Sequence, residues 1–298
     1  MCSYFVFDSS SLDFWKYFFL TKKNENVEET SYNVSEFQKK SNWYEEYMQY
    51  KNLHKKTEGK SQIIALIDSG VSNFQKSQVE RNYNMLSNVD TFDENGHGTM
   101  MCSLILGGDQ LLGIAPKSKI YSYKVVDESG KVAPQILAKA IDKAVQDKVT
   151  IINISLGSYF NNKKVKKAIN NAANLGITIV ASSGDYNTED MLYPAKYKCC
   201  ISVGAMDKKM NVWENTNAKD KCDILAPGVN VKTILNTREL VTTSGTSQAT
   251  ALISGYVALI KDYAIIKGIN VTNEQIKELI QKINNKKITY LEGLEELK

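Results

Sequence analysis

From Ser61 onward, strand-length apolar runs alternate with segments of helical periodicity, and this alternation is the strongest constraint on the fold. Such an order is typical of βαβ units built around a buried, mostly parallel sheet. Strands are predicted at residues 63–67, 120–126, 149–154, 177–181 and 199–203. Helices are predicted at residues 134–147, 161–175, 249–261 and 272–283. We therefore expect an α/β domain whose central sheet is mostly parallel, with helices on both faces.

The chain has 298 residues, enough for one large α/β domain and an appendage. Residues 61–298 contain no internal repeat and no low-complexity linker, so they are expected to form one domain. Residues 1–60 differ from the rest, being first aromatic and then rich in Lys, Glu and Asn, with a helix predicted from about Glu36 to Lys56. We interpret them as an N-terminal extension or a short prosegment.

The charges are balanced and spread along the chain. Lys and Arg total 37 against 33 Asp and Glu, which gives a formal net charge of +4. No arm or stripe concentrates the basic residues, so we expect no nucleic-acid partner. The densest basic run, residues 163–167, opens a predicted helix and is interpreted as a solvated face.

The cysteines and the N-terminus both point to a cytoplasmic protein. No Cys-x-x-Cys pair and no His at metal spacing is found, so no metal site is predicted and the cysteines are interpreted as small buried residues in a reducing compartment. Asp8 and Asp13 interrupt the aromatic N-terminus, which lacks the basic start of a secretory signal. No apolar run approaches the ~20 residues that span a bilayer, so no transmembrane segment is expected. The five cysteines are Cys2, Cys102, Cys199, Cys200 and Cys222.

Two short segments carry an acid and an imidazole that the sheet itself does not require. Asp68 ends the apolar run IALID, at the edge where parallel sheets bind ligands, although Asp also serves in turns. The chain has two histidines, of which His54 lies among lysines on a polar helix and is interpreted as surface. His97 lies between Gly96 and Gly98 and leads into an apolar helix, so it is the candidate general base.

A third segment, TTSGTSQAT, raises the question of a nucleophile. Ser247 begins a helix that is apolar nearly all round. A serine in this position can cap the helix through a backbone N–H. As a nucleophile it would need a base and a group that orients the base, which His97 and Asp68 can supply.

The order Asp, His, Ser in the contexts D-S-G, H-G-T and G-T-S-x-A resembles the subtilisin-like serine proteases. The segments IINISLG (151–157), YPAKYKCCISVGAMD (193–207) and LAPGVNV (225–231) extend the resemblance over about residues 61–265. It implies a subtilisin-like fold and a Ser-His-Asp endopeptidase. In that reaction Ser247 attacks the scissile carbonyl, His97 takes and returns the proton, and Asp68 orients His97.

The resemblance also implies where a peptide substrate binds. Ser155, Leu156 and Gly157 would pair with the extended substrate and line the pocket for the residue before the cut. Ser129 and Gly130 resemble the facing edge strand. Binding would then occur by strand addition, in which main-chain hydrogen bonds provide affinity and side-chain pockets provide selectivity.

One departure from the family pattern affects the oxyanion hole. Residues 181–185 read ASSGD, where the family usually has an A-A-G-N motif whose Asn donates a hydrogen bond to the oxyanion. Asp185 takes the place of that Asn, and an ionised carboxylate has no proton to donate. Either Asp185 is protonated in the filled site, or the Ser247 backbone N–H acts alone. We expect a slow, specific enzyme, with an inactive pseudoprotease as the alternative.

The same replacement occurs in some lantibiotic leader peptidases, which resemble this chain in size and in lacking a secretion signal. The preferred interpretation is therefore an intracellular protease that removes the leader from a lantibiotic precursor peptide. A general intracellular serine protease and a peptide-binding pseudoprotease are the alternatives. The segment GGDQLL (107–112) lacks the family's Asn-rich calcium loop, so no cofactor is expected, with calcium at another site left open.

Overall fold

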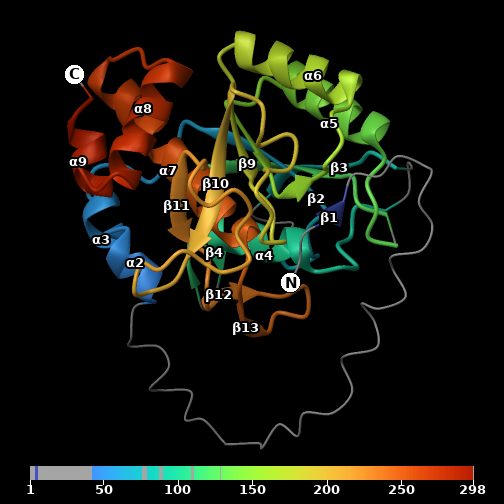
Figure 1. The fold of residues 1–298 in the computed structure, drawn as a ribbon, viewed down its shortest axis with the longest axis horizontal. Helices are drawn as coiled ribbons and strands as arrows, with labels where there is room; N and C mark the ends of the chain where they lie inside the picture. The colour runs from blue at the N-terminus through green and yellow to red at the C-terminus, as the bar shows by residue number, and fades with distance from the viewer. Residues whose placement is uncertain are drawn as a thin grey trace, which may run out of the picture.

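The fold is built around a seven-stranded sheet in which every neighbouring pair is parallel (Figure 1). The structure is a computed structural model that describes residues 4–5, 42–75, 79–86, 90–108, 111–127 and 129–297. The strand order is β11-β10-β9-β7-β2-β6-β3. The strands are β2 (Ile63–Asp68), β3 (Val79–Asn84), β6 (Lys119–Lys124), β7 (Ile151–Ile154), β9 (Thr178–Ser182), β10 (Cys200–Met206) and β11 (Ile224–Pro227).

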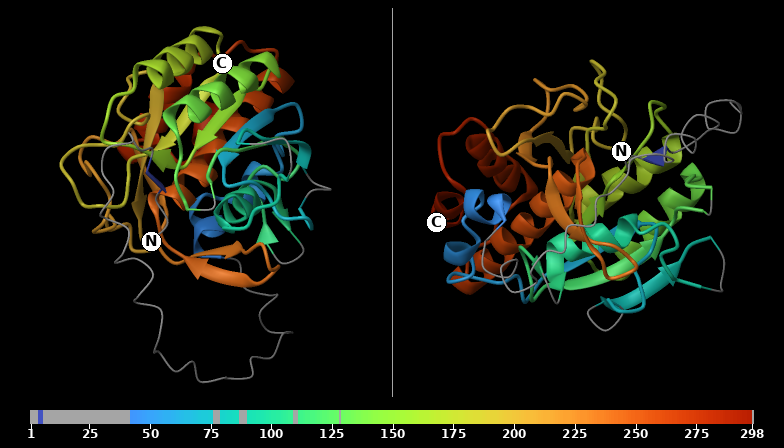
Figure 2. Two further views of the ribbon diagram at one scale, coloured as in Figure 1. Left: turned by 90° about the vertical axis from the view of Figure 1, so that its right-hand side faces the viewer. Right: turned by 90° about the horizontal axis from the view of Figure 1, so that it is seen from below.

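Helices cover both faces of this sheet, as expected (Figure 2). On one face lie α4 (His97–Leu106) and the long α7 (Thr246–Lys267), and on the other lie α5 (Pro134–Gln146) and α6 (Lys163–Asn174). Alternate residues of β2 enter the two cores, with Ile64 and Leu66 on the α7 side and Ala65 and Ile67 on the α5 side. A strand buried on both faces must be apolar throughout, which is why the central strands are apolar runs.

The strands and helices predicted from Ser61 onward are all present, with shifted ends. The helix predicted at 249–261 is longer, because α7 includes the turn that carries Ser247 and continues to Lys267. A capping box at Thr272 opens α8 (Asn273–Asn284), and Gly176, which follows α6, has a left-handed φ of 79°. The edge strands β3 and β11 were not predicted. β3 reads VERNYN, which has no apolar alternation and is mostly exposed or half-buried, and β11 has four residues and ends in Pro.

Three short two-stranded pairs and a terminal helix complete the described structure. β4 (Gly107–Gly108) pairs with β5 (Leu111–Leu112), and β12 (Val231–Ile234) pairs with β13 (Leu240–Thr243). β1 (Tyr4–Phe5) pairs with β8 (Leu156–Gly157). The helix α9 (Tyr290–Glu295) lies close to the end of the chain.

The helix predicted from about Glu36 to Lys56 is two helices over its described part. These are α2 (Trp43–Tyr47) and α3 (Tyr50–Leu53), interrupted at Gln49, whose φ of 61° is left-handed and ends the regular helix; residues 36–41 lie outside the described residues. Tyr44 and its buried neighbours join the same core as α4 and α7. The division of the chain at residues 60 and 61 stays a prediction.

One helix among the described residues, α7, is long and apolar enough to cross a membrane by length and composition. Of its most apolar window, 83% is buried inside the molecule. The core helix of a compact domain passes the same test, so this helix is weak evidence for a membrane span.

The burial of Tyr44 predicts that α2 contributes to stability. Its ring is fully buried and its hydroxyl donates to the Lys232 carbonyl over 3.1 Å. We expect Tyr44→Ala to lower the free energy of unfolding by about 3 kcal/mol or more, because truncating a buried aromatic ring leaves a cavity. Urea denaturation measures the change. Lys51→Ala, at an exposed position of α3, should stay within about 0.5 kcal/mol, and equal values for the two variants would contradict the prediction.

Candidate active site

The acid and the imidazole singled out in the sequence meet at the carboxyl edge of the sheet. Asp68 is the last residue of β2, and His97 is the first residue of α4. His97 Nδ1 lies 2.7 Å from Asp68 Oδ1, and both side chains are buried. With Asp68 ionised, Nδ1 carries the proton that this bond requires, which makes Nε2 the basic nitrogen. The pair thus has the arrangement of a general base and the carboxylate that orients it.

A second buried carboxylate, Asp93, holds the start of α4 in place, and it was not predicted. It accepts hydrogen bonds from the Gly96 and Thr99 N–H groups, each over 2.8 Å, and from the Thr99 hydroxyl over 2.6 Å. It also accepts from the Ser69 hydroxyl, whose oxygen in turn accepts from the Gly98 N–H. An Asp a few residues before a predicted helix is a capping signal, and it would have identified Asp93 from the sequence.

The close approach of α4 to β2 depends on Gly98. A β-carbon at this residue would lie 2.1 Å from the Gly70 carbonyl oxygen and 3.2 Å from the Asp68 β-carbon. Only glycine therefore lets the first turn of α4 pass near enough for His97 to reach Asp68. The H-G-T motif is a packing requirement as well as a catalytic signature.

Ser247 lies in the first turn of α7, beside the end of β7. Its Oγ is 3.5 Å from the Ser155 carbonyl oxygen, and the Ser155 Oγ is 3.5 Å from the Ser247 carbonyl oxygen. The side chains of both serines are buried. The N-terminus of a long helix concentrates unpaired backbone N–H groups, which favours negative charge nearby. A hydroxyl in this position has a local environment suited to stabilising an oxyanion.

Asp185 lies at the same helix terminus and is held there by Thr246. Its Oδ1 accepts from the Thr246 N–H over 2.9 Å and from the Thr246 hydroxyl over 2.6 Å. The carboxyl group is nearly fully buried. Asp185 is thus an acceptor that secures the turn before Ser247, a role that the family comparison in the sequence did not indicate. Since two donors occupy Oδ1, a proton offered to an oxyanion would have to be carried by Oδ2.

The charges around the imidazole favour its protonated form. Burial lowers the pKa of His97, but the Asp68 carboxylate, and more weakly those of Asp93 and Asp185, raise it further, so that the pKa lies above its usual range. An imidazolium at His97 would be stabilised by the same charges.

The edge expected to bind substrate is paired with the chain's own N-terminus. Tyr4 and Phe5 lie in parallel register with Leu156 and Gly157. This β1 strand occupies the position along β8 where an added peptide strand was predicted. Ser129 and Gly130 lie in a turn in which Asp127 Oδ1 accepts from the Ser129 and Lys131 N–H groups, with no strand pairing among the described residues there. Their role as a facing strand stays a prediction.

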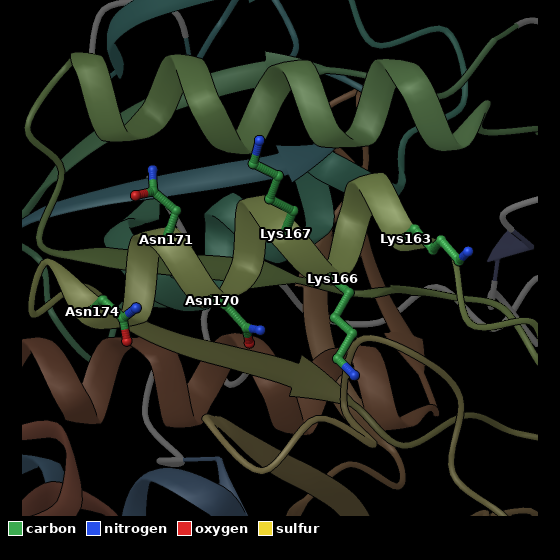
Figure 3. A pocket seen from close by; sticks show the side chains of 6 residues that line it. All are labelled: Lys163, Lys166, Lys167, Asn170, Asn171 and Asn174. Atoms are coloured by element: carbon green, nitrogen blue, oxygen red, sulfur yellow. The ribbon is translucent and has the colours of Figure 1, made fainter.

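Among the described residues, no group of three or more His, Cys, Asp or Glu side chains is arranged to hold a metal ion. A hollow lies along α6, where lysines and asparagines line it (Figure 3). These side chains are exposed, as expected of a solvated face. They are Lys163, Lys166, Lys167, Asn170, Asn171 and Asn174.

Comparison with known proteins assigns the chain to a family. The profile of the subtilase family matches residues 59–292, and the chain belongs to this family of subtilisin-like serine proteases. It is 33% identical to the minor extracellular protease Epr of Bacillus subtilis over 229 residues, which are 75% of this chain and 35% of that protein. It is 34% identical to the major intracellular serine protease of the same organism over 180 residues, 57% of this chain and 56% of that protein.

A solved structure supports the fold. The prenylagaramide maturation protease PagA superimposes with a TM-score of 0.67 at 27% identity, covering 77% of this chain and 86% of that one. The thermostable alkaline protease of Halalkalibacterium halodurans is 31% identical over 237 residues. This chain spans 63% of that protease and about a third of Epr.

Replacing Asp185 with Asn tests the oxyanion hole. The Asn Oδ1 can keep both bonds from Thr246, while its Nδ2 adds the missing donor. We expect Asp185→Asn to raise kcat by up to about 10²-fold, because loss of such a donor in a subtilisin lowers kcat by about 10²–10³-fold. Asp185→Ala, which removes the acceptor and adds no donor, should leave kcat no higher and lower stability by about 1 kcal/mol. An unchanged kcat in Asp185→Asn at every pH would contradict the assignment.

The raised pKa of His97 predicts the acid limb of the pH profile. The base acts in its neutral form, so activity should rise with pH about a midpoint above roughly 6.5, the usual pKa of His. Asp185→Asn removes one of the carboxylates that raise this pKa, and the midpoint of kcat/KM against pH should therefore move down. Asp142→Asn, at an exposed position of α5, should leave it in place. The same midpoint in all three proteins would exclude the proposed coupling.

Proposed function

We propose that this chain is a serine endopeptidase in which Ser247 is the nucleophile, His97 the general base and Asp68 the group that orients it. The observation that carries the proposal is the buried 2.7 Å bond between His97 and Asp68, at the sheet edge that also holds Ser247. Burial destabilises a charged imidazole relative to one at the surface, and the adjoining carboxylates offset this loss of stability. Such an arrangement is typical of a catalytic base.

We further propose a processing role inside the cell, namely removal of the leader from a lantibiotic precursor peptide, with no cofactor required. The similarity to a maturation protease supports a processing role, and the similarity to an intracellular protease of Bacillus subtilis supports the location. A buried acceptor at Asp185 in place of a donor supports a slow enzyme, which suits one specific cut better than general degradation.

The N-terminal residues are proposed to act as a reduced prosegment. The pairing of β1 with β8 is the observation in favour, because a peptide added to the same edge would have to displace it. The two alternatives are a general intracellular serine protease and a peptide-binding pseudoprotease. In the second, the cleft would bind peptides and no bond would break.

A fluorophosphonate probe distinguishes these functions. We expect one covalent adduct in the intact mass, absent in Ser247→Ala and retained in Ser244→Ala, whose hydroxyl belongs to the turn before α7. Only a serine activated by a neighbouring base reacts at a useful rate.

An adduct that persists in Ser247→Ala would overturn the assignment of the nucleophile. No adduct from pH 5 to 9 on folded protein would favour the peptide-binding alternative or a site closed by residues 1–5. The same measurement on a protein that lacks those residues separates the two, since labelling returns only in the second case.

A further inference from the structure

A leucine of the chain itself lies between the two backbone segments that lead to Ser155 and Asp185. β7 and β9 run side by side, with Ile154 paired to Ala181. Beyond these ends, one strand continues to Ser155, next to Ser247, and the other continues to Asp185, next to Thr246. The two backbone segments therefore flank the nucleophile, and a gap between them is where α/β sheets receive ligands.

Leu192 occupies this gap. A β-carbon at Gly157, on one wall, would lie 2.6 Å from both Cβ and Cδ1 of Leu192. A β-carbon at Gly184, on the other wall, would lie 2.8 Å from the same Cδ1. One side chain thus packs against both walls at the points where each wall lacks a side chain. Leu192 is 1% exposed, so it is enclosed there.

The segment that carries Leu192 is fixed to both walls. The Leu192 N–H donates to the Ser183 carbonyl over 3.0 Å. Tyr193 and Ser158 exchange two backbone bonds, of 2.8 and 3.0 Å. Moving the backbone at Leu192 away from the gap would break these three bonds, so the position of the leucine Cβ is fixed by the backbone.

The wall at Gly184 is also rigid. The Asn217 N–H donates to the Gly184 carbonyl over 2.9 Å, and the Asn217 Oδ1 accepts from the Tyr186 and Thr188 N–H groups. Gly184 itself has a φ of 109°, which side-chain-bearing residues rarely adopt. The two walls therefore cannot separate without loss of buried hydrogen bonds.

We infer that Leu192 is a specificity-determining residue that restricts the substrate residue before the scissile bond to a small one, glycine, alanine or serine. This inference rests on the proposed function, because it assumes that a peptide paired with β8 presents its carbonyl to Ser247. The side chain next to that carbonyl then enters the gap between Gly157 and Gly184. A leucine or phenylalanine there would meet Leu192, and one surplus methylene in a tight pocket can change selectivity 10-fold or more.

The test uses peptides that differ only at the residue before the cut, which is alanine, leucine or phenylalanine. We expect the unchanged protein to favour alanine over phenylalanine by about 100-fold in kcat/KM. Leu192→Ala should raise kcat/KM for phenylalanine at least about 10-fold and change that for alanine by less than about 3-fold. Leu192→Val, a smaller change that keeps most of the packing, should raise the value for leucine.

Leu279→Ala is the matched control, because it removes the same atoms from a buried leucine of α8. It should leave the selectivity unchanged. Efficient cleavage after phenylalanine by the unchanged protein, or the same selectivity in Leu192→Ala as in Leu279→Ala, would overturn the inference.

Two further measurements separate this inference from the proposed function. The rate of fluorophosphonate labelling should be equal in the unchanged protein and Leu192→Ala. Loss of labelling in Leu192→Ala alone would show that this substitution disturbs the fold, and the selectivity of Leu192→Val would then decide. If no peptide is cleaved, the affinities of Ser247→Ala for the alanine and phenylalanine peptides, measured by fluorescence anisotropy, test the pocket without catalysis. Tighter binding of the alanine peptide than of the phenylalanine peptide, with this preference lost in the double variant Ser247→Ala, Leu192→Ala, supports the inference about Leu192 even where the proposed catalysis fails. Equal binding of the two peptides overturns the inference.

Discussion

The buried bond between His97 and Asp68 is the interaction on which the rest of the site depends. An imidazole without a partner would be destabilised in this interior, and the charges of Asp68, Asp93 and Asp185 reverse that effect. The bond requires the first turn of α4 to approach the end of β2 closely, which Gly98 permits and the Asp93 cap secures. A central parallel sheet supplies this geometry, because its strands end together at one edge.

Asp185 holds the turn before Ser247 in place, but its carboxylate supplies no hydrogen-bond donor where the family usually has an Asn. Its carboxylate lies at the N-terminus of α7, where the helix dipole and the Thr246 donors stabilise negative charge. In the proposed reaction, the same negative charge opposes the oxyanion that forms on attack by Ser247. A carboxylate here also holds the pKa of His97 higher, which strengthens the base while reducing its neutral fraction at a given pH. In the proposed reaction, these effects together favour a low turnover rate.

The sequence predicted the central strands and the candidate site residues at one sheet edge because both have local signatures. Apolar runs mark β2, β7 and β9, and the H-G-T and G-T-S-x-A motifs mark the residues at two helix starts. The edge strand β3 escaped prediction because exposure on its outer side removes the apolar pattern. The role of Thr246 toward Asp185 escaped it as well, since the two residues lie 61 positions apart and their contact exists only in the folded chain.

The obstruction by Leu192 belongs to the same class of features that no local pattern encodes. Leucine in the segment MLYPAK looks like an ordinary core residue, and glycine at positions 157 and 184 looks like an ordinary turn. Only the fold brings the three together, with the leucine side chain against both glycines. A β-carbon at either glycine would collide with Leu192, and one at Gly184 would also meet the Asn217 side chain. A pocket closed in this way excludes large side chains through steric overlap with a backbone-anchored residue, whereas β8 supplies affinity without regard to sequence. Selectivity and binding are thereby carried by separate parts of the cleft, an arrangement suited to a protease that makes one cut in a long extended peptide.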